Sequence, residues 1–137
     1  MKDSRFLIIE DNPGDIRLMQ IAIQRAQIPV ELEVHGRGEE ALKDLKDRSE
    51  ANFPDLIILD INLPGMTGFE ILKEIKSDSR LSRIPAFIMS SSENVKDRER
   101  AVSGGALNYF SKPNTMQDLQ NLMISFVEST QMKESSQ

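Results

Sequence analysis

The sequence predicts a single α/β domain in which a parallel five-stranded sheet is covered by helices on both faces, the doubly wound arrangement. Three observations predict it. Five short apolar runs alternate with helical patterns along the 137 residues, and runs such as 6–9 and 56–59 are apolar at every position. Uninterrupted apolar strands are typical of sheets buried on both faces. The alternation favours parallel strands joined by right-handed crossovers. A two-layer sheet with antiparallel edges is the alternative.

The five expected strands differ in their patterns. They lie at residues 6–9, 30–34, 56–59, 86–89 and 106–110. The first, third and fourth are continuous apolar runs, and the third ends directly on Asp60. The second alternates apolar and acidic residues, which indicates a strand near the edge of the sheet. The fifth is short and leads into Lys112-Pro113.

The expected helices carry apolar stripes with helical spacing. They lie at residues 19–26, 39–46, 68–76, 95–103 and 119–127. A turn at Asn12-Pro13-Gly14 precedes the first, and Pro29 follows it. The fourth is only weakly amphipathic. Thr115 and Asp118 form a possible capping box for the last. Residues 46–52 and 77–83 are expected to be connections. The expected domain spans 1–127, followed by a polar, frayed tail at 128–137.

Composition narrows the possible functions. The net charge of −5 and the isoelectric point near 4.9 argue against a nucleic-acid surface, which needs clustered positive charge. The absence of cysteine excludes disulfide scaffolds and thiolate metal sites, and it is compatible with a reducing cytosol. No apolar run is long enough for a membrane span or a signal-peptide core. We therefore expect a cytoplasmic protein without membrane or nucleic-acid partners.

Reactive side chains follow four of the expected strands. Glu10 and Asp11 follow the first strand, Asp60 the third, the run Ser90-Ser91-Ser92 the fourth, and Lys112 the fifth. In an open parallel sheet, ligands bind beyond the carboxyl ends of the strands. Each residue alone has an ordinary explanation, such as a turn, a helix cap or a surface charge. Together they predict one site at that edge.

The three acidic residues predict a cation site. Clustered carboxylates repel one another, and each raises the pKa of the others. A divalent cation removes that cost, and Mg²⁺ prefers oxygen ligands. Asp60 can also attack phosphorus as a nucleophile, with a cation, Lys112 and the Ser90 hydroxyl neutralising the phosphoryl oxygens. The bond between Lys112 and Pro113 can be cis at low cost, which would turn the lysine toward the sheet edge.

These residues resemble the response-regulator receiver family. The similarity covers residues 5–127 and includes the paired acids Glu10-Asp11, the segment LIILDINLPGMTG at 56–68, and Gly105-Ala106 with Lys112-Pro113. The resemblance implies the sheet order 2-1-3-4-5 of the flavodoxin-like fold and Asp60 as the phosphoacceptor. Glu10 and Ser90 stand where the family more often has Asp and Thr, and both keep the chemical group that the role needs.

The resemblance also implies roles for the remaining site residues. Mg²⁺ would bind Glu10, Asp11, Asp60 and the backbone carbonyl of Asn62. Lys112 and Ser90 would hold the other phosphoryl oxygens, and Ser90 with Tyr109 would act as the switch that repacks the face made by the fourth helix, the fifth strand and the last helix. The chain would not be an enzyme in the classified sense, although it assists its own phosphorylation and dephosphorylation.

The resemblance implies partners as well. A sensor histidine kinase would supply the phosphoryl group, and a phosphotransfer protein could receive it. The segment EDNPGDIRL at 10–18 and the connector at 76–85 are similar to single-domain receivers that serve phytochrome-type kinases. Such receivers often pair through the fifth strand and last helix. The apolar stripe at 119–127 suits a homodimer of that kind, although most of it is expected in the core.

Two other functions are compatible with the same fold. An aspartate-nucleophile phosphatase would need a second acid two residues after the nucleophile, but Asn62 occupies that position. A pseudo-receiver would bind partners without phosphorylation, and the intact set of site residues argues against it. His35, the only histidine, is expected at the surface of an edge strand and is assigned no chemistry.

Overall fold

A computed structural model describes residues 3–92 and 94–135. Five parallel strands form one sheet in the order β2-β1-β3-β4-β5, as the family resemblance implied. The strands are β1 (Ser4–Ile9), β2 (Val30–His35), β3 (Leu56–Leu59), β4 (Ala86–Ser90) and β5 (Asn108–Ser111). The prediction of a doubly wound α/β fold is confirmed.

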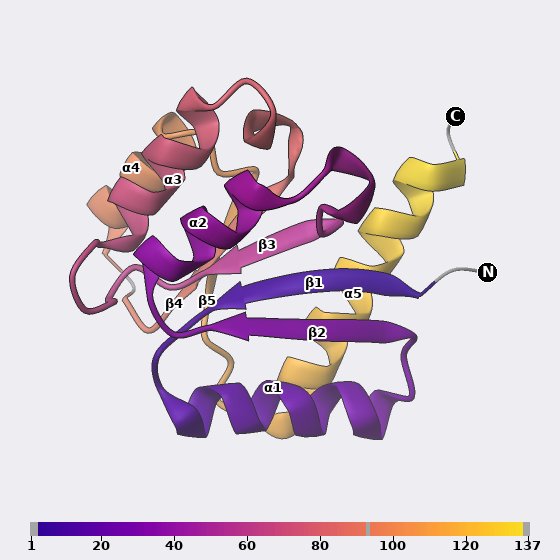
Figure 1. The fold of residues 1–137 in the computed structure, drawn as a ribbon. Coiled ribbons are helices and arrows are strands. Elements are labelled where there is room, and N and C mark those ends of the chain that lie inside the picture. The colour runs from indigo at the N-terminus through magenta and orange to yellow at the C-terminus, as the bar shows by residue number, and fades with distance from the viewer. Residues whose placement is uncertain (1–2, 93, 136–137) are drawn as a thin grey trace.

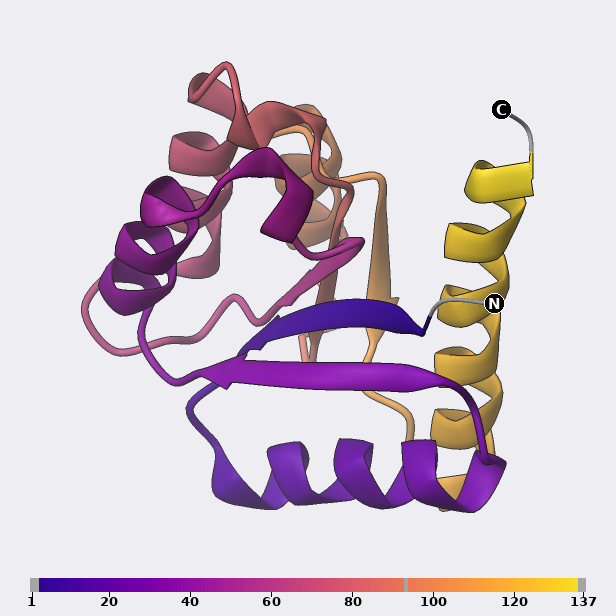
Figure 2. The ribbon, with the colours of Figure 1, turned by 45° about the vertical axis from the view of Figure 1, so that its right-hand side comes forward.

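Helices cover both faces of the sheet (Figures 1 and 2). The helices α1 (Pro13–Ala26) and α5 (Met116–Ser135) pack together on one face. The other face carries α2 (Gly38–Asp47), α3 (Gly68–Ser77) and α4 (Val95–Ser103). Short 3-10 turns, η1 (Glu50–Asn52) and η2 (Leu81–Arg83), lie in segments that were expected to be connections. Within the described residues, no helix is long and apolar enough to cross a membrane.

The continuous apolar strands supply both cores at once. On β1, Leu7 and Ile9 pack beneath α2 and α3, whereas Phe6 and Ile8 pack beneath α1 and α5. Successive side chains point to opposite faces of a strand, so a strand covered on both faces must be apolar at every position. The edge strand β2 is half-exposed and alternates apolar and acidic residues, as its pattern predicted.

Local signals fix where the helices begin. The Asn12 side chain accepts a hydrogen bond from the Asp15 backbone N–H, and Pro13 occupies the first helical position of α1. Thr67 and Glu70 form a complete capping box at α3. At α5, the Thr115 hydroxyl accepts from the Asp118 backbone N–H, which is the first half of the predicted box.

Three local predictions differ from the structure. The fifth strand begins at Asn108 rather than 106; the Ala106 N–H donates to the Ala101 carbonyl in α4, and the Leu107 N–H is the first to donate to the neighbouring strand, at Ala86 of β4. No peptide bond is cis among the described residues, so the Lys112–Pro113 bond is trans. The predicted tail at 128–137 is helical as far as Ser135, and residues 136–137 lie outside the described part. The sequence at 128–135 does not continue the apolar stripe of 119–127, but the helix does not depend on that stripe to continue.

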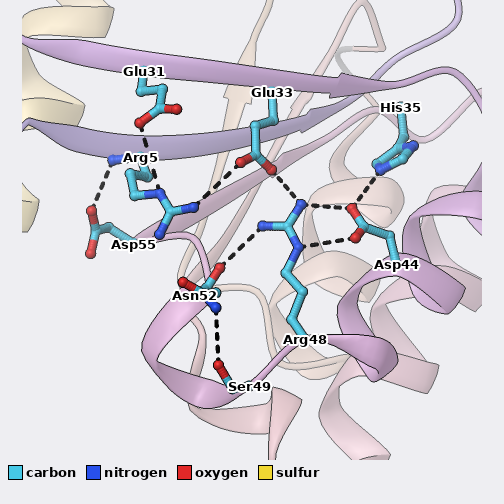
Figure 3. Close-up of polar contacts among 9 residues, drawn as sticks. All are labelled: Arg5, Glu31, Glu33, His35, Asp44, Arg48, Ser49, Asn52 and Asp55. Atoms are coloured by element: carbon cyan, nitrogen blue, oxygen red, sulfur yellow. Dashed lines mark hydrogen bonds and ion pairs between the residues drawn. The ribbon is translucent and has the colours of Figure 1, made fainter.

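A polar network ties α2 to the outer strand (Figure 3). The Arg48 guanidinium contacts Asp44 at 2.6 Å and also pairs with Glu33 on β2. His35 lies on the edge strand β2, as expected, but it is half-buried rather than at the surface, 2.8 Å from Asp44. This network holds the carboxyl end of β2 in place, and the His35 carbonyl accepts the backbone N–H of Glu10.

Candidate functional site

A polar cleft lies at the carboxyl edge of the sheet. Its lining includes Glu10, Asp11, Asp60, Asn62 and Lys112, which come from the ends of β1, β3 and β5. A second cavity lies at the opposite edge, beneath β3 and β4, and contains none of the predicted site residues. The parallel topology therefore gathers side chains that are up to 102 residues apart in the sequence.

The carboxylates meet at the floor of this cleft. Glu10 and Asp60 are buried, at 2% and 7% exposure, whereas Asp11 is exposed. One oxygen from each lies within 4.8 Å of the others. The backbone hydrogen bonds between β1 and β3 continue past the end of β3, because the Asp60 N–H donates to the Ile9 carbonyl at 3.1 Å. Burial raises the pKa of the Glu10 carboxyl, the Lys112 hydrogen bond opposes that rise, and the charge of Asp60 adds to it.

The carboxylate cluster fits a hard divalent cation. Mg²⁺ binds oxygen at about 2.1 Å, so two oxygens on one ion are at most about 4.2 Å apart. The three oxygens of Glu10, Asp11 and Asp60 already lie within 4.8 Å of one another. In the lining of the cleft, the Lys112 ammonium stands against four carboxylates, those of Glu10, Asp11, Asp15 and Asp60, so negative charge is in excess. A cation would relieve that excess at little structural cost.

Lys112 lies among the acids. Its Nζ donates to Glu10 Oε2 at 3.0 Å and to Asp15 Oδ2 at 2.6 Å, and it lies 3.5 Å from Asp60 Oδ2. Its backbone N–H donates to the Ser90 carbonyl at 2.8 Å, which fixes the start of the side chain beside β4. Burial lowers the pKa of the ammonium, but the hydrogen bonds to Asp15 and Glu10 and the charge of Asp60 outweigh this and raise it above its ordinary value. The lysine is therefore charged.

The two predicted switch residues lie beneath the cleft rather than in its lining. Ser90 is fully buried, and its Oγ accepts a hydrogen bond from the Ser92 backbone N–H at 3.2 Å. Tyr109 is 2% exposed, and its hydroxyl donates to the Ser92 carbonyl at 2.7 Å. Tyr109 thus occupies an inward position in this structure. Its movement on phosphorylation stays a prediction, as does the bond from Ser90 to phosphate.

Sequence reasoning missed two residues at this edge. Asp15 is the nearest carboxylate to Lys112, and its only sequence signal was its place in the turn before the first helix. Ser92 links Ser90 to Tyr109 through its backbone, and its hydroxyl donates to Asp97 at 2.7 Å. The run of three serines pointed to the segment, but it did not single out Ser92.

The fold and the site define a class of protein. The carboxyl edge of this flavodoxin-like sheet holds an acid cluster, a half-buried lysine and a buried aspartate at a strand end. These groups suit the transfer of a phosphoryl group to a carboxylate. The family model for the response regulator receiver domain matches residues 6–124. The chain belongs to the response regulator receiver domain family, and the prediction of that family is confirmed.

Its relatives include regulators from cyanobacteria and plants. Response regulator Rcp1 of Synechocystis sp. (strain ATCC 27184 / PCC 6803 / Kazusa) is 34% identical over 116 residues, which are 82% of this chain and 79% of Rcp1. Two-component response regulator ORR1 of Oryza sativa subsp. japonica is 30% identical over 123 residues, which are 87% of this chain. The chain spans about half of ORR1, at 53% of its length.

Solved structures agree with these relationships. The phosphorylated cyanobacterial phytochrome response regulator RcpA superposes with a TM-score of 0.81 at 36% identity, covering 93% of this chain and 96% of RcpA. The Mn²⁺-bound form of Rcp1 superposes with a TM-score of 0.75 at 32% identity, covering 87% of this chain and 88% of Rcp1. A cyanobacterial phytochrome response regulator is thus among the proteins to which this chain is similar.

Proposed function

We propose that this chain is a phosphoacceptor response regulator and that Asp60 takes the phosphoryl group from a sensor histidine kinase. The observation that carries the proposal is the position of Asp60. It ends a buried strand, 3.5 Å from the Lys112 ammonium, and it shares an oxygen cluster with Glu10 and Asp11. A carboxylate placed between a cation site and a lysine is ready to attack phosphorus.

The transfer needs little chemistry beyond positioning. An Asp60 oxygen attacks the phosphorus of a phosphohistidine, the P–N bond breaks as the O–P bond forms, and the imidazole nitrogen keeps the electron pair and is reprotonated. Lys112 pairs with one phosphoryl oxygen, and Ser90 reaches another after leaving its bond to Ser92. Asn62 offers its backbone carbonyl beside Asp60, and no acid stands in its place to catalyse hydrolysis as a phosphatase would.

We propose Mg²⁺ as the cation of this site. Glu10, Asp11, Asp60 and the Asn62 carbonyl would hold it, and four protein ligands at most leave room for water and phosphoryl oxygens. When bound, the ion neutralises the charge that develops on the phosphoryl oxygens. The Mn²⁺-bound form of Rcp1 supports a divalent cation in this family.

The partner that we propose is a phytochrome-type histidine kinase, with the transfer taking place in the cytoplasm. The relationship to RcpA, a phytochrome response regulator, supports this choice. Leu18 on α1 is 47% exposed and lines a small hollow together with Lys112 and Pro113, which also line the polar cleft. An exposed apolar side chain next to the cleft suits contact with the kinase. Leu18→Ala should slow transfer from the phosphorylated kinase and leave labelling by acetyl phosphate unchanged.

A small phosphodonor tests the acceptor directly. Incubation with acetyl phosphate and Mg²⁺ should add one phosphoryl mass to the intact chain, and removal of Mg²⁺ should suppress the addition. Asp60→Asn should abolish it while Asp55→Asn, at the opposite end of β3, should not. Undiminished labelling of Asp60→Asn would overturn the assignment. A chain that is never labelled, even by a kinase, would favour the pseudo-receiver.

Signalling would then leave by protein contact, including relay to a phosphotransfer protein. The face of α4 and β5 suits such contact, because Val95, Val102 and Leu107 are 67%, 54% and 66% exposed. Movement of Ser90 toward phosphate would break its bond to Ser92, whose carbonyl holds the Tyr109 hydroxyl. The phosphoryl group would thereby bias the packing beneath this face.

We also propose a homodimer through β5 and α5. Among the described residues β5 pairs only with β4, and Phe110 on β5 and Leu122 on α5 are only half-buried. Phe126 packs in the core against Phe87 and Phe110, with ring centroids 5.0 and 5.1 Å apart, so it is no probe of the interface. Leu122→Asp is the better variant. Sedimentation as a monomer at high micromolar concentration, with and without acetyl phosphate, would rule the dimer out.

A further inference from the structure

The resting partner of Lys112 is not the proposed phosphoacceptor. Its Nζ is 2.6 Å from Asp15 and 3.0 Å from Glu10, both at hydrogen-bonding distance, but 3.5 Å from Asp60. Good N–H···O bonds span about 2.7–3.2 Å, so the contact with Asp60 is an ion pair without a well-formed hydrogen bond. The shortest and strongest interaction therefore directs the ammonium toward α1.

A phosphoryl group on Asp60 changes the competition for this ammonium. Its oxygens would need one of the lysine's three N–H donors at close range. Glu10 would keep the bond from the Asn12 N–H, but its side chain is 3% exposed, so little water could replace the ammonium. The Asp15 side chain is 31% exposed, and water can solvate it. Asp15 is the carboxylate that can release the lysine at the lower cost.

Asp15 also keeps its position when Lys112 moves away from it. It is the third residue of α1, its backbone N–H is held by the Asn12 cap, and its charge lies at the positive end of the helix. The turn that delivers Asp15 to the cleft is fixed by Pro13 at the first helical position. The carboxylate is thus held in position by the backbone, whether or not it contacts Lys112.

We propose that Asp15 is a positioning residue that holds Lys112 in a resting position, and that phosphorylation moves the lysine from Asp15 to a phosphoryl oxygen. The inference rests on the proposed function of Asp60. Asp15 acts through Lys112 and touches neither the phosphoryl group nor the cation. It therefore restrains the reaction: while the lysine pairs with Asp15, less of its charge is available to the phosphoryl oxygens, where negative charge must be neutralised during transfer.

Removal of the Asp15 charge should make phosphorylation faster. Asp15→Asn keeps the shape and loses the charge, so phosphorylation by acetyl phosphate at saturating Mg²⁺ should become roughly two- to fivefold faster, the factor expected for a partly exposed ion pair. Asp15→Glu keeps the charge and should stay near the wild-type rate. Asp118→Asn is the matched control, because Asp118 is the third residue of α5, is exposed and is likewise bonded through its backbone N–H to the capping side chain. It should react at the wild-type rate.

A double-mutant cycle separates this role from a structural one. In the slower Lys112→Ala background, followed over hours, Asp15→Asn should change the rate by less than about 1.5-fold, because no lysine remains to be released. A wild-type or slower rate for Asp15→Asn, or an equal acceleration without Lys112, would overturn the inference. Labelling of wild type but not of Asp60→Asn in the same series keeps that failure distinct from failure of the proposed function. Melting curves check that every variant is folded.

Discussion

Gly68 places the start of α3 against the backbone of the proposed phosphoacceptor, and a single methyl group tests how much that contact matters. Its N–H donates to the Ile61 carbonyl at 2.8 Å. A Cβ at this position would lie 2.7 Å from the Ile61 Cα and 2.9 Å from the Asp60 carbonyl carbon, and closer still to the carbonyl oxygen. Ordinary contacts begin near 3.4 Å, so Gly68→Ala requires the two segments to separate by most of an ångström.

The expected cost follows from this overlap. The clash is with backbone, which cannot rotate away as a flexible side chain can, and overpacking of this kind costs about 1–3 kcal/mol. Alanine recovers up to about 1 kcal/mol as a better helix former. A net loss of about 1–2 kcal/mol should lower the melting temperature by roughly 3–10 °C in a domain of this size. Because Asp60 itself moves, acetyl phosphate labelling should slow by about tenfold or more.

Thermal melting and intact-mass kinetics on one preparation measure both effects. Gly36→Ala is the control, since a Cβ there would approach only the Glu10 carbonyl, at 3.9 Å. Its melting temperature should stay within about 2 °C of wild type, as for other substitutions without a clash. If Gly68→Ala melts and reacts like wild type, the close approach of α3 does not position Asp60.

Three further predictions concern charge. Lys112→Ala should slow phosphorylation and, because Glu10 then lies buried without its partner, cost about 1–2 kcal/mol in denaturant unfolding without Mg²⁺; unchanged stability would mean that water reaches Glu10. Asp11→Ala should remove most of the Mg²⁺-induced rise in melting temperature, and an undiminished rise would exclude the acid cluster as the site. The Arg48 hydrogen bond lowers the pKa of Asp44 from 3.8 to about 2. The stabilisation that the ionised Asp44 provides is therefore present above about pH 4 and lost toward pH 2. Asp44→Asn should make the fall in the unfolding free energy over that range smaller, by about 1 kcal/mol for a group one-third exposed.

The hydrophobic pattern was sufficient for the architecture. The run 56–59 is apolar throughout and forms β3 over the predicted residues, and the run at β1 was placed within two residues. The least accurate boundaries were at β5 and α5. Ala106 looks like a strand residue, but its N–H bonds to Ala101 in α4, and the helix α5 continues to Ser135 although the sequence from 128 onward is polar. Boundaries depend on hydrogen-bond partners, which a pattern of side chains does not specify.

The sequence by itself determined that Glu10, Asp11, Asp60 and Lys112 follow strand ends, because strand ends can be read from where apolar runs stop. Parallel strands place those ends at one edge, so the acid cluster followed from the fold class alone. Only the tertiary structure decided which carboxylate Lys112 contacts most closely. Asp15 comes from a helix, and its distance to Lys112 depends on how α1 packs against the sheet and α5, which is set by core side chains such as Met19 and Leu119. The same holds for Tyr109, whose inward position depends on a Ser92 carbonyl supplied by another loop.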